Sequence, residues 1–259
     1  MNAKNWICST AVAMVAVFGG APVQASIMIT PPAPSRYVAS AVTSGFTGAT
    51  VAGPFTSSTA FGLFSPAPSS VSSVGGPLGI DSATATQSSL TPSITGSSIS
   101  GGGTATASVT WVGPSGYSVT ADSFFDVFFE VDLPGTFNLS GVVDSGGTFP
   151  PGSGIDSAEV KLVDNALPGS PLFLEGTNPG DPGPDPFNVN LSLTPGITYR
   201  LTARALVSRG GPSGVASADA SWNLNLEEVA VPEPSTFVLA ALGLLGLGCV
   251  ALRKKYRRA

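Results

Sequence analysis

Residues 124–132 read FFDVFFEVD, and this stretch restricts the fold more strongly than any other part of the chain. In a β-strand, successive side chains point to opposite faces, so every second residue shares a face. One face of this segment is purely apolar and consists of Phe125, Val127, Phe129, Val131 and Leu133. The opposite face mixes phenylalanine with acidic residues. Such alternation predicts a strand with one buried side, within residues 117–133.

Similar segments lie on both sides of this strand. Residues 104–112 alternate small and β-branched side chains, and residues 83–90 show a weaker form of the pattern. Further strands are predicted at 136–143, 158–163, 171–174, 187–193, 197–207 and 216–226. Turn-forming residues separate them, and Thr194-Pro195-Gly196 fits a type II turn. We therefore predict a mainly β fold, a single antiparallel β-sandwich domain that is jelly-roll-like and has eight to ten strands.

The composition excludes several kinds of chemistry. The chain has 259 residues with two Cys and no His. Without His there is no Ser-His-Asp triad, no imidazole base and no His-ligated metal, and we predict no cofactor. Cys8 and Cys249 lie near the two ends, so the central part has to be stabilised by its own core without a disulfide.

The first 25 residues have the organisation of a secretory signal peptide. Lys4 supplies a positive charge, residues 7–18 form an uncharged apolar run, and Val23-Gln24-Ala25 ends in a small residue that signal peptidase accepts. We predict export, with cleavage between Ala25 and Ser26.

A second apolar run occupies residues 235–252, eighteen residues without a charge. As a helix it would be about 27 Å long, close to the thickness of the hydrocarbon layer. A basic tail, residues 253–258, follows at once and contains Arg253, Lys254, Lys255, Arg257 and Arg258. Because Lys and Arg stay on the cytoplasmic side, we predict a transmembrane helix in the inner membrane with the preceding domain in the periplasm.

Pro232-Glu233-Pro234 stands just before this run. The triplet, the Leu- and Gly-rich run and the basic tail follow one another in the order found in the PEP-CTERM sorting domain, which residues 231–258 resemble. Proteins with this domain are substrates of exosortase, a membrane enzyme of Gram-negative bacteria. The resemblance implies that exosortase recognises Pro232, Glu233 and Pro234, and that the protein is then sorted to the cell surface or the extracellular space.

Between these ends, residues 81–230 carry the predicted sandwich, and residues 26–80 are rich in Pro, Ser, Thr and Gly. This composition leaves two alternatives open for 26–80, edge strands or a mobile segment. The region from 26 to 230 has five basic and fifteen acidic residues, a net charge of −10. A surface of this charge repels nucleic acid, so no nucleic-acid partner is expected.

Any catalysis would have to use carboxylates. Asp126 and Glu130 lie about 13 Å apart on one strand face, too far for a glycosidase pair, whereas Glu130 and Asp132, about 7 Å apart, could form an inverting pair. The simpler interpretation is that all three are solvated charges on a strand face, and we predict no catalytic residue. Asp181 and Asp185 are the candidate calcium ligands, but neither EF-hand spacing nor a nonapeptide repeat accompanies them, so no metal site is predicted.

Three functions follow from these observations. The resemblance favours a non-enzymatic surface or matrix protein, processed by signal peptidase and exosortase and associated with exopolysaccharide in a biofilm. The second is a carbohydrate-binding β-sandwich module, which needs exposed rings, and the candidate rings are Trp111, Tyr117, Tyr199 and Trp222. The third is a glycoside hydrolase that uses the carboxylates described above.

Overall fold

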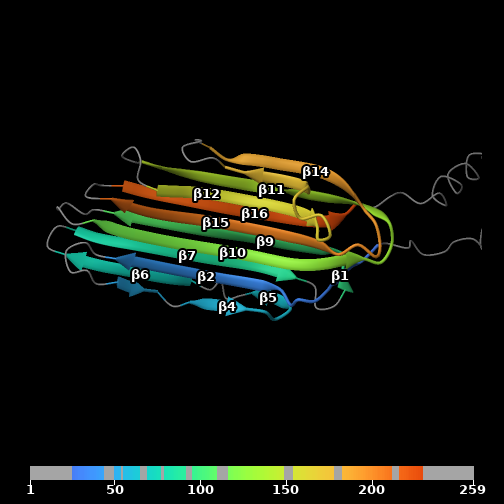
Figure 1. The fold of residues 1–259 in the computed structure, drawn as a ribbon, viewed down its shortest axis with the longest axis horizontal. Coiled ribbons are helices and arrows are strands. Elements are labelled where there is room, and N and C mark those ends of the chain that lie inside the picture. Colours follow the sequence, from blue (N-terminus) through green and yellow to red (C-terminus); the bar gives the residue numbers. More distant parts are fainter. Residues whose placement is uncertain are drawn as a thin grey trace, which may run out of the picture. The chain divides into compact units, whose positions relative to one another are not determined.

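The alternating segment around FFDVFFEVD forms β10 (Tyr117–Val131), an interior strand of a sheet (Figure 1). The computed structural model describes residues 25–43, 50–53, 55–64, 69–76, 79–91, 95–109, 116–148, 154–177, 183–211 and 216–229. Residues 1–24 of the predicted signal peptide (1–25) and the predicted transmembrane run 235–252 lie outside these residues. Among the residues described, no helix has the length and apolar character needed to cross a bilayer.

The described strands form two antiparallel sheets. The main part of sheet A runs in the order β13-β12-β15-β10-β2, and sheet B runs in the order β14-β11-β16-β9-β7. Besides β10, sheet A contains β1 (Ile27–Ile29), β2 (Ser35–Thr43), β3 (Thr50–Ala52), β4 (Thr56–Ser58), β8 (Thr95–Gly96), β12 (Gly154–Asp164), β13 (Pro171–Gly176) and β15 (Tyr199–Gly211). Sheet B contains β5 (Gly62–Phe64), β6 (Ser69–Gly76), β7 (Gly79–Thr91), β9 (Ser98–Val109), β11 (Gly135–Thr148), β14 (Asp185–Leu193) and β16 (Ala216–Glu228).

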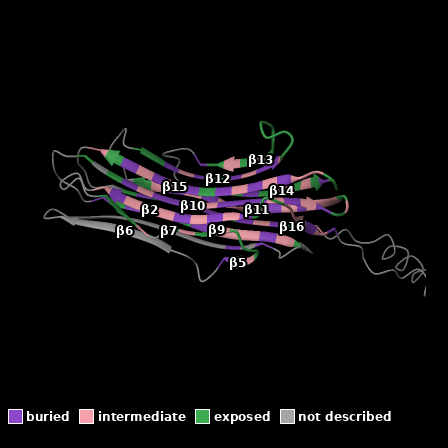
Figure 2. Cartoon of the chain, turned by 60° about the horizontal axis from the view of Figure 1, so that its bottom comes forward, coloured by how far each residue is buried: buried purple, intermediate pink, exposed green. Residues whose placement is uncertain are grey.

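The inward faces of the two sheets share one hydrophobic core. From β9 to β16 the chain changes sheet at almost every connection, so neighbours in sequence face each other across that core. Buried and partly exposed residues alternate along the strands, as the banding in Figure 2 shows. The prediction of a mainly β, antiparallel fold is therefore confirmed.

Each strand predicted between residues 83 and 226 corresponds to a strand of the structure, with ends that differ by a few residues. Gly196 has a φ of +77°, the positive value that the predicted type II turn requires at this position. The end of the predicted strand 104–112 lies outside the described residues beyond Val109. Residues 26–80, whose order was left open, contribute β1 to β6 and the start of β7.

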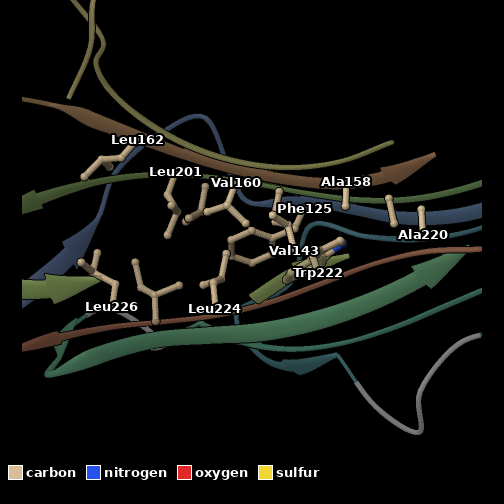
Figure 3. Packing of buried hydrophobic residues seen from close by; sticks show 14 of the residues in the cluster. Phe125, Val143, Ala158, Val160, Leu162, Leu201, Ala220, Trp222, Leu224 and Leu226 are labelled. Atoms are coloured by element: carbon tan, nitrogen blue, oxygen red, sulfur yellow. The ribbon is translucent and has the colours of Figure 1, made fainter. Parts of the chain in front are cut away.

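The centre of the core is a contact between the two sheets. Phe125 of β10 and Trp222 of β16 lie side by side with ring centroids 5.7 Å apart (Figure 3). Trp222 has room because its neighbour on β9 is Gly103. A Cβ atom on Gly103 would lie 2.6 Å from the indole Nε1, and one on Gly101 would lie 3.1 Å from the six-membered ring. We call these two inward-facing glycines the glycine floor.

The same device recurs near one edge of sheet B. Phe187 of β14 is the direct cross-strand partner of Gly141 on β11, where a Cβ atom would lie 2.6 Å from the Phe187 ring. Phe187 also contacts Phe173 of β13, with centroids 5.0 Å apart. Because β13 is in sheet A, this aromatic pair joins the two sheets at their common edge.

Two of the five basic residues between 26 and 230 point into the core. Arg36 of β2 donates hydrogen bonds to the carbonyls of Gly62 (2.9 Å), Ser89 (3.4 Å) and Ala60, and its guanidinium lies 5.0 Å from the centroid of Phe64. Since Arg36 belongs to sheet A, and Gly62 and Ser89 belong to β5 and β7 of sheet B, this side chain links the two sheets. Burial lowers the pKa of Arg36.

Arg209 of β15 is the second buried cation. Its Nη2 lies 2.7 Å from Oδ1 of Asp156 on β12, and the side chains are 5% and 1% exposed. Removing one partner of such a pair leaves a buried charge and costs about 3–5 kcal/mol. The other three basic residues, Lys161, Arg200 and Arg204, occupy outward positions of β12 and β15.

Replacing Gly103 by alanine should destabilise the fold. The new methyl group would overlap the Trp222 indole, and overpacking of this kind costs about 1–3 kcal/mol. Gly146→Ala on β11 is the matched control, because its nearest neighbour atom is 3.5 Å away, an ordinary contact. Urea unfolding followed by tryptophan fluorescence should show a lower midpoint for Gly103→Ala alone; equal midpoints would contradict the role of the glycine floor.

Candidate functional site

The outer face of sheet A carries a repeating arrangement of charged and aromatic side chains. On β10 the outward positions are Asp122, Phe124, Asp126 and Phe128. In the register with β15, Phe124 lies opposite Arg204 and Phe128 opposite Arg200. Each arginine therefore reaches diagonally to the aspartate two residues before its aromatic partner, and the pattern repeats every four residues along β10.

Both arginines bind their aspartates through two nitrogen atoms. Arg204 donates from Nε (3.0 Å) and Nη2 (2.7 Å) to Asp122, and Arg200 donates from Nε and Nη2 (both 2.9 Å) to Asp126. The arginine side chains are 46% and 41% exposed and the aspartates 12% and 10%. Hydrogen bonding to the carboxylates raises the pKa of both arginines. These forks position the side chains accurately, while solvent limits their contribution to stability.

The aromatic rings on this face form a row across the strands. Tyr37 of β2 stacks on Phe124 with centroids 5.0 Å apart, and Phe55, which precedes β4, lies 5.7 Å from Tyr37. Phe55 is 65% exposed. The Tyr37 hydroxyl donates to Asp122 Oδ2 at 3.1 Å, so the tyrosine joins the row to the first fork.

Phe128 extends the arrangement along β10. The Arg200 guanidinium lies over its ring at 5.2 Å from the centroid, a cation–π contact. We define the aromatic–arginine strip as Tyr37, Phe55, Phe124, Phe128, Arg200 and Arg204. Apolar ring surfaces beside hydrogen-bonding groups held in fixed positions are the elements with which proteins bind small polar molecules such as sugars.

The structure corrects two of the candidate sugar-binding rings. Tyr199 and Trp222 are 3% and 2% exposed because both occupy inward positions in their strands. The Tyr199 hydroxyl accepts from the Thr194 backbone N–H at 2.9 Å, inside the turn before β15. Trp111 and the side chain of Tyr117 lie outside the described residues. The sequence analysis missed Tyr37. Buried and partly exposed residues alternate in residues 35–43, and this pattern, which puts Tyr37 on the outer face, was the available signal.

The three carboxylates considered for catalysis do not share an environment. Asp126, interpreted above as a solvated charge, is only 8% exposed because Arg200 and its neighbours cover it. Glu130 accepts a hydrogen bond from Thr198 Oγ1 at 2.8 Å. Asp132 follows the end of β10 and is exposed, and it binds Ser26.

Only one of the two candidate calcium ligands is among the described residues. Asp181 lies outside the described residues, and Asp185 begins β14 with a half-buried side chain. Within the part of the chain that the structure describes, no three Asp, Glu, Cys or His side chains come together as metal ligands would.

Ala25 and Ser26, the predicted cleavage site, are the first two residues described. Ala25 lies beside Glu228 at the end of β16, and Ser26 lies beside Asp132, which directly follows β10. The sorting-signal residues Pro232, Glu233, Pro234, Arg253, Lys254, Lys255, Arg257 and Arg258 lie outside the described residues.

Comparison with protein families identifies the C-terminal segment. Residues 230–258 match the PEP-CTERM protein-sorting motif, which confirms the resemblance drawn from the triplet, the apolar run and the basic tail. The motif implies an exported protein that exosortase processes at the membrane. The chain has no significant match among curated proteins. Because the motif begins directly after β16, it leaves the role of the two sheets to be inferred from their own residues.

The Tyr37–Asp122 contact predicts an unusual titration. Burial, then the charge and hydrogen bond of Asp122, raise the pKa of Tyr37 to about 12. Asp122→Asn should lower this pKa but leave it above the ordinary value of about 10, because burial is the largest cause. Phenolate absorbance during an alkaline titration measures this pKa, and the Tyr37→Phe variant shows which part of the absorbance change comes from Tyr37. Asp126→Asn, in the other fork, should leave the pKa of Tyr37 unchanged. The same Tyr37 pKa in Asp122→Asn and in the wild type would contradict the contact.

Proposed function

We propose that the chain is a non-enzymatic cell-surface or extracellular matrix protein of a Gram-negative bacterium, associated with exopolysaccharide in a biofilm. The observation that carries this proposal is the PEP-CTERM motif at residues 230–258. After removal of the signal peptide, the domain of two sheets faces the periplasm while residues 235–252 hold the chain in the inner membrane. Exosortase then acts at Pro232-Glu233-Pro234 and removes this temporary anchor.

The hydrogen-bonding of the carboxylates supports a non-enzymatic role. A glycosidase needs one carboxyl group to donate a proton and a second to attack or to activate water. Asp126 already accepts two hydrogen bonds from Arg200, which hold its carboxylate in place. Glu130 is engaged by Thr198 and Asp132 by Ser26. Each of the three carboxylates is thus held by a hydrogen bond from a neighbouring side chain or backbone group, which fits a structural role.

The strand order supports a more specific fold assignment. Numbering β9 to β16 from one to eight, sheet B has the order 6-3-8-1 and sheet A the order 5-4-7-2. This is the arrangement of a jelly roll, in which two Greek keys are folded together. A jelly roll presents two broad sheet faces to the solvent, and here one of them carries the aromatic–arginine strip.

A second candidate function, binding of a carbohydrate, is favoured by that strip. Its rings and planar guanidinium groups can lie against the apolar faces of sugar rings, and the arginine forks and the Tyr37 hydroxyl can contact sugar hydroxyls. Arg200 and Arg204 on this face are matched by Asp126 and Asp122, and the domain as a whole is acidic. A neutral polysaccharide therefore fits better than an anionic one. Such binding would place the protein in the matrix that the sorting pathway serves.

Processing can be tested by replacing Pro232, Glu233 and Pro234 together with alanine. These residues precede the apolar run, so insertion should be unaffected while removal of the tail is blocked. Immunoblots of the native host should show a full-length, membrane-bound band for the triple variant and a shorter product for the wild type. Equal full-length bands for both proteins would show that the sorting signal is not used.

Polysaccharide binding can be tested by depletion of the exported protein from solution by the host's insoluble exopolysaccharide and by cellulose. Phe55→Ala with Phe128→Ala should weaken binding about tenfold, as the loss of two ring contacts worth about 0.5–1.5 kcal/mol each predicts. Asn223→Ala, an exposed position on β16 in sheet B, is the control and should bind like the wild type. Equal depletion of the double variant and the wild type would contradict a role for the strip.

A further inference from the structure

Each of the first two residues of the described domain donates a hydrogen bond to a carboxylate. The backbone N–H of Ala25 donates to Glu228 Oε1 at 2.8 Å. The backbone N–H of Ser26 donates to Asp132 Oδ1 and its hydroxyl to Asp132 Oδ2, both at 2.6 Å. Asp132 follows β10 and Glu228 ends β16, so the beginning of the domain lies beside the strand that leads into the sorting motif.

We propose that Asp132 is the binding site for the new N-terminus that signal peptidase creates at Ser26. In that reaction water adds across the Ala25–Ser26 peptide bond. Ala25 leaves with a carboxylate, and the nitrogen of Ser26 becomes an α-amino group that is protonated at neutral pH. This inference rests on the proposed export pathway and adds to it a site within the folded domain.

The geometry for this contact already exists in the uncut chain. The Ser26 nitrogen that would become the ammonium group already lies at hydrogen-bonding distance from an ionised carboxylate. Cleavage therefore converts an ordinary N–H donor into a charged one, and charge-assisted hydrogen bonds are roughly twice as strong as neutral ones. The two hydrogen bonds from Ser26 lower the pKa of Asp132, which keeps it ionised. A serine suits this position because its hydroxyl occupies the second carboxylate oxygen.

Burial of the cleavage site implies an order of events. Ala25 is only 3% exposed. It packs closely against Gly135, since a Cβ atom added to Gly135 would lie 3.4 Å from the Cβ atom of Ala25. Burial of Ala25 would hinder signal peptidase once the domain has folded, so we expect cleavage before β1 pairs with β10, and the new ammonium group then meets Asp132 when β1 pairs. Loss of Ala25 also leaves Glu228 without this donor.

The test uses the full-length gene expressed in the native host and the exported protein purified from it. Mass spectrometry identifies the N-terminal residue and measures how fast an amine-reactive acylating reagent labels its α-amino group near neutral pH. Only the unprotonated amine reacts, and a rise of one unit in its pKa reduces that fraction about tenfold. We expect Ser26 as the N-terminus, and labelling roughly three- to tenfold faster in Asp132→Asn than in the wild type.

Two further variants separate the ion pair from other effects. Ser26→Ala keeps the ammonium group and loses only the hydroxyl, so its labelling should stay slow. Asp219→Asn, nine residues along β16 from Glu228 and roughly 30 Å away, should label like the wild type. Equal labelling rates in the wild type and Asp132→Asn, or an N-terminus other than Ser26, would overturn the proposal. Because signal peptidase acts without exosortase, the intact mass of the C-terminal end reports separately whether tail processing has failed.

Discussion

The contact between Trp222 and the glycine floor is the constraint on which the rest of the domain depends. An indole in the middle of a sandwich needs space that two ordinary strands do not leave, and Gly101 and Gly103 provide it on the neighbouring strand β9. The ring then reaches Phe125 of the other sheet, so a single side chain sets both the pairing of β16 with β9 and the distance between the sheets. A shift of β16 by one residue would place the indole outside and a polar residue inside, which is why the register is strongly determined.

The outer face of sheet A follows from that inner arrangement. Because Phe125, Val127 and Phe129 are held inside, Asp122, Phe124, Asp126 and Phe128 must face outward. The register with β15, set by the core, then brings Arg204 and Arg200 within reach of the two aspartates. The core therefore fixes the backbone positions from which the side chains of β10 and β15 in the strip project. Rigid positioning suits a binding surface, since side chains that are already ordered lose little entropy when a ligand binds.

The strands were predictable from the sequence, and the pairs between them were not. The period of two in FFDVFFEVD and in residues 216–226 identifies strands and their buried faces from local information alone. The Arg200–Asp126 fork joins residues 74 positions apart, and its existence depends on a register that no local pattern reveals. Tyr199 and Trp222 were misassigned for a related reason: an amphipathic ring is found both in cores and at binding sites, and only the strand register places it. The strands before residue 80 were only one of two alternatives left open, because Pro, Ser, Thr and Gly are frequent in this region and long apolar runs are few. Pairing with longer strands, such as that of β2 with β10, could not be read from this composition.

The positions of the two ends connect the fold with the sorting signal. β1 pairs with the last residues of β10, and β16 ends at Glu228, whose carboxylate meets Ala25. The N-terminal and C-terminal ends of the domain are thus held together by the same strands that enclose the core. Pro232 is only four positions after Glu228, a reach of about 13 Å even when the chain is fully extended. The proposed cleavage at the triplet would therefore bring exosortase within that distance of Glu228. The end of β16 can keep its structure when the enzyme binds there, because its residues are hydrogen-bonded along both edges, to β11 and to β9.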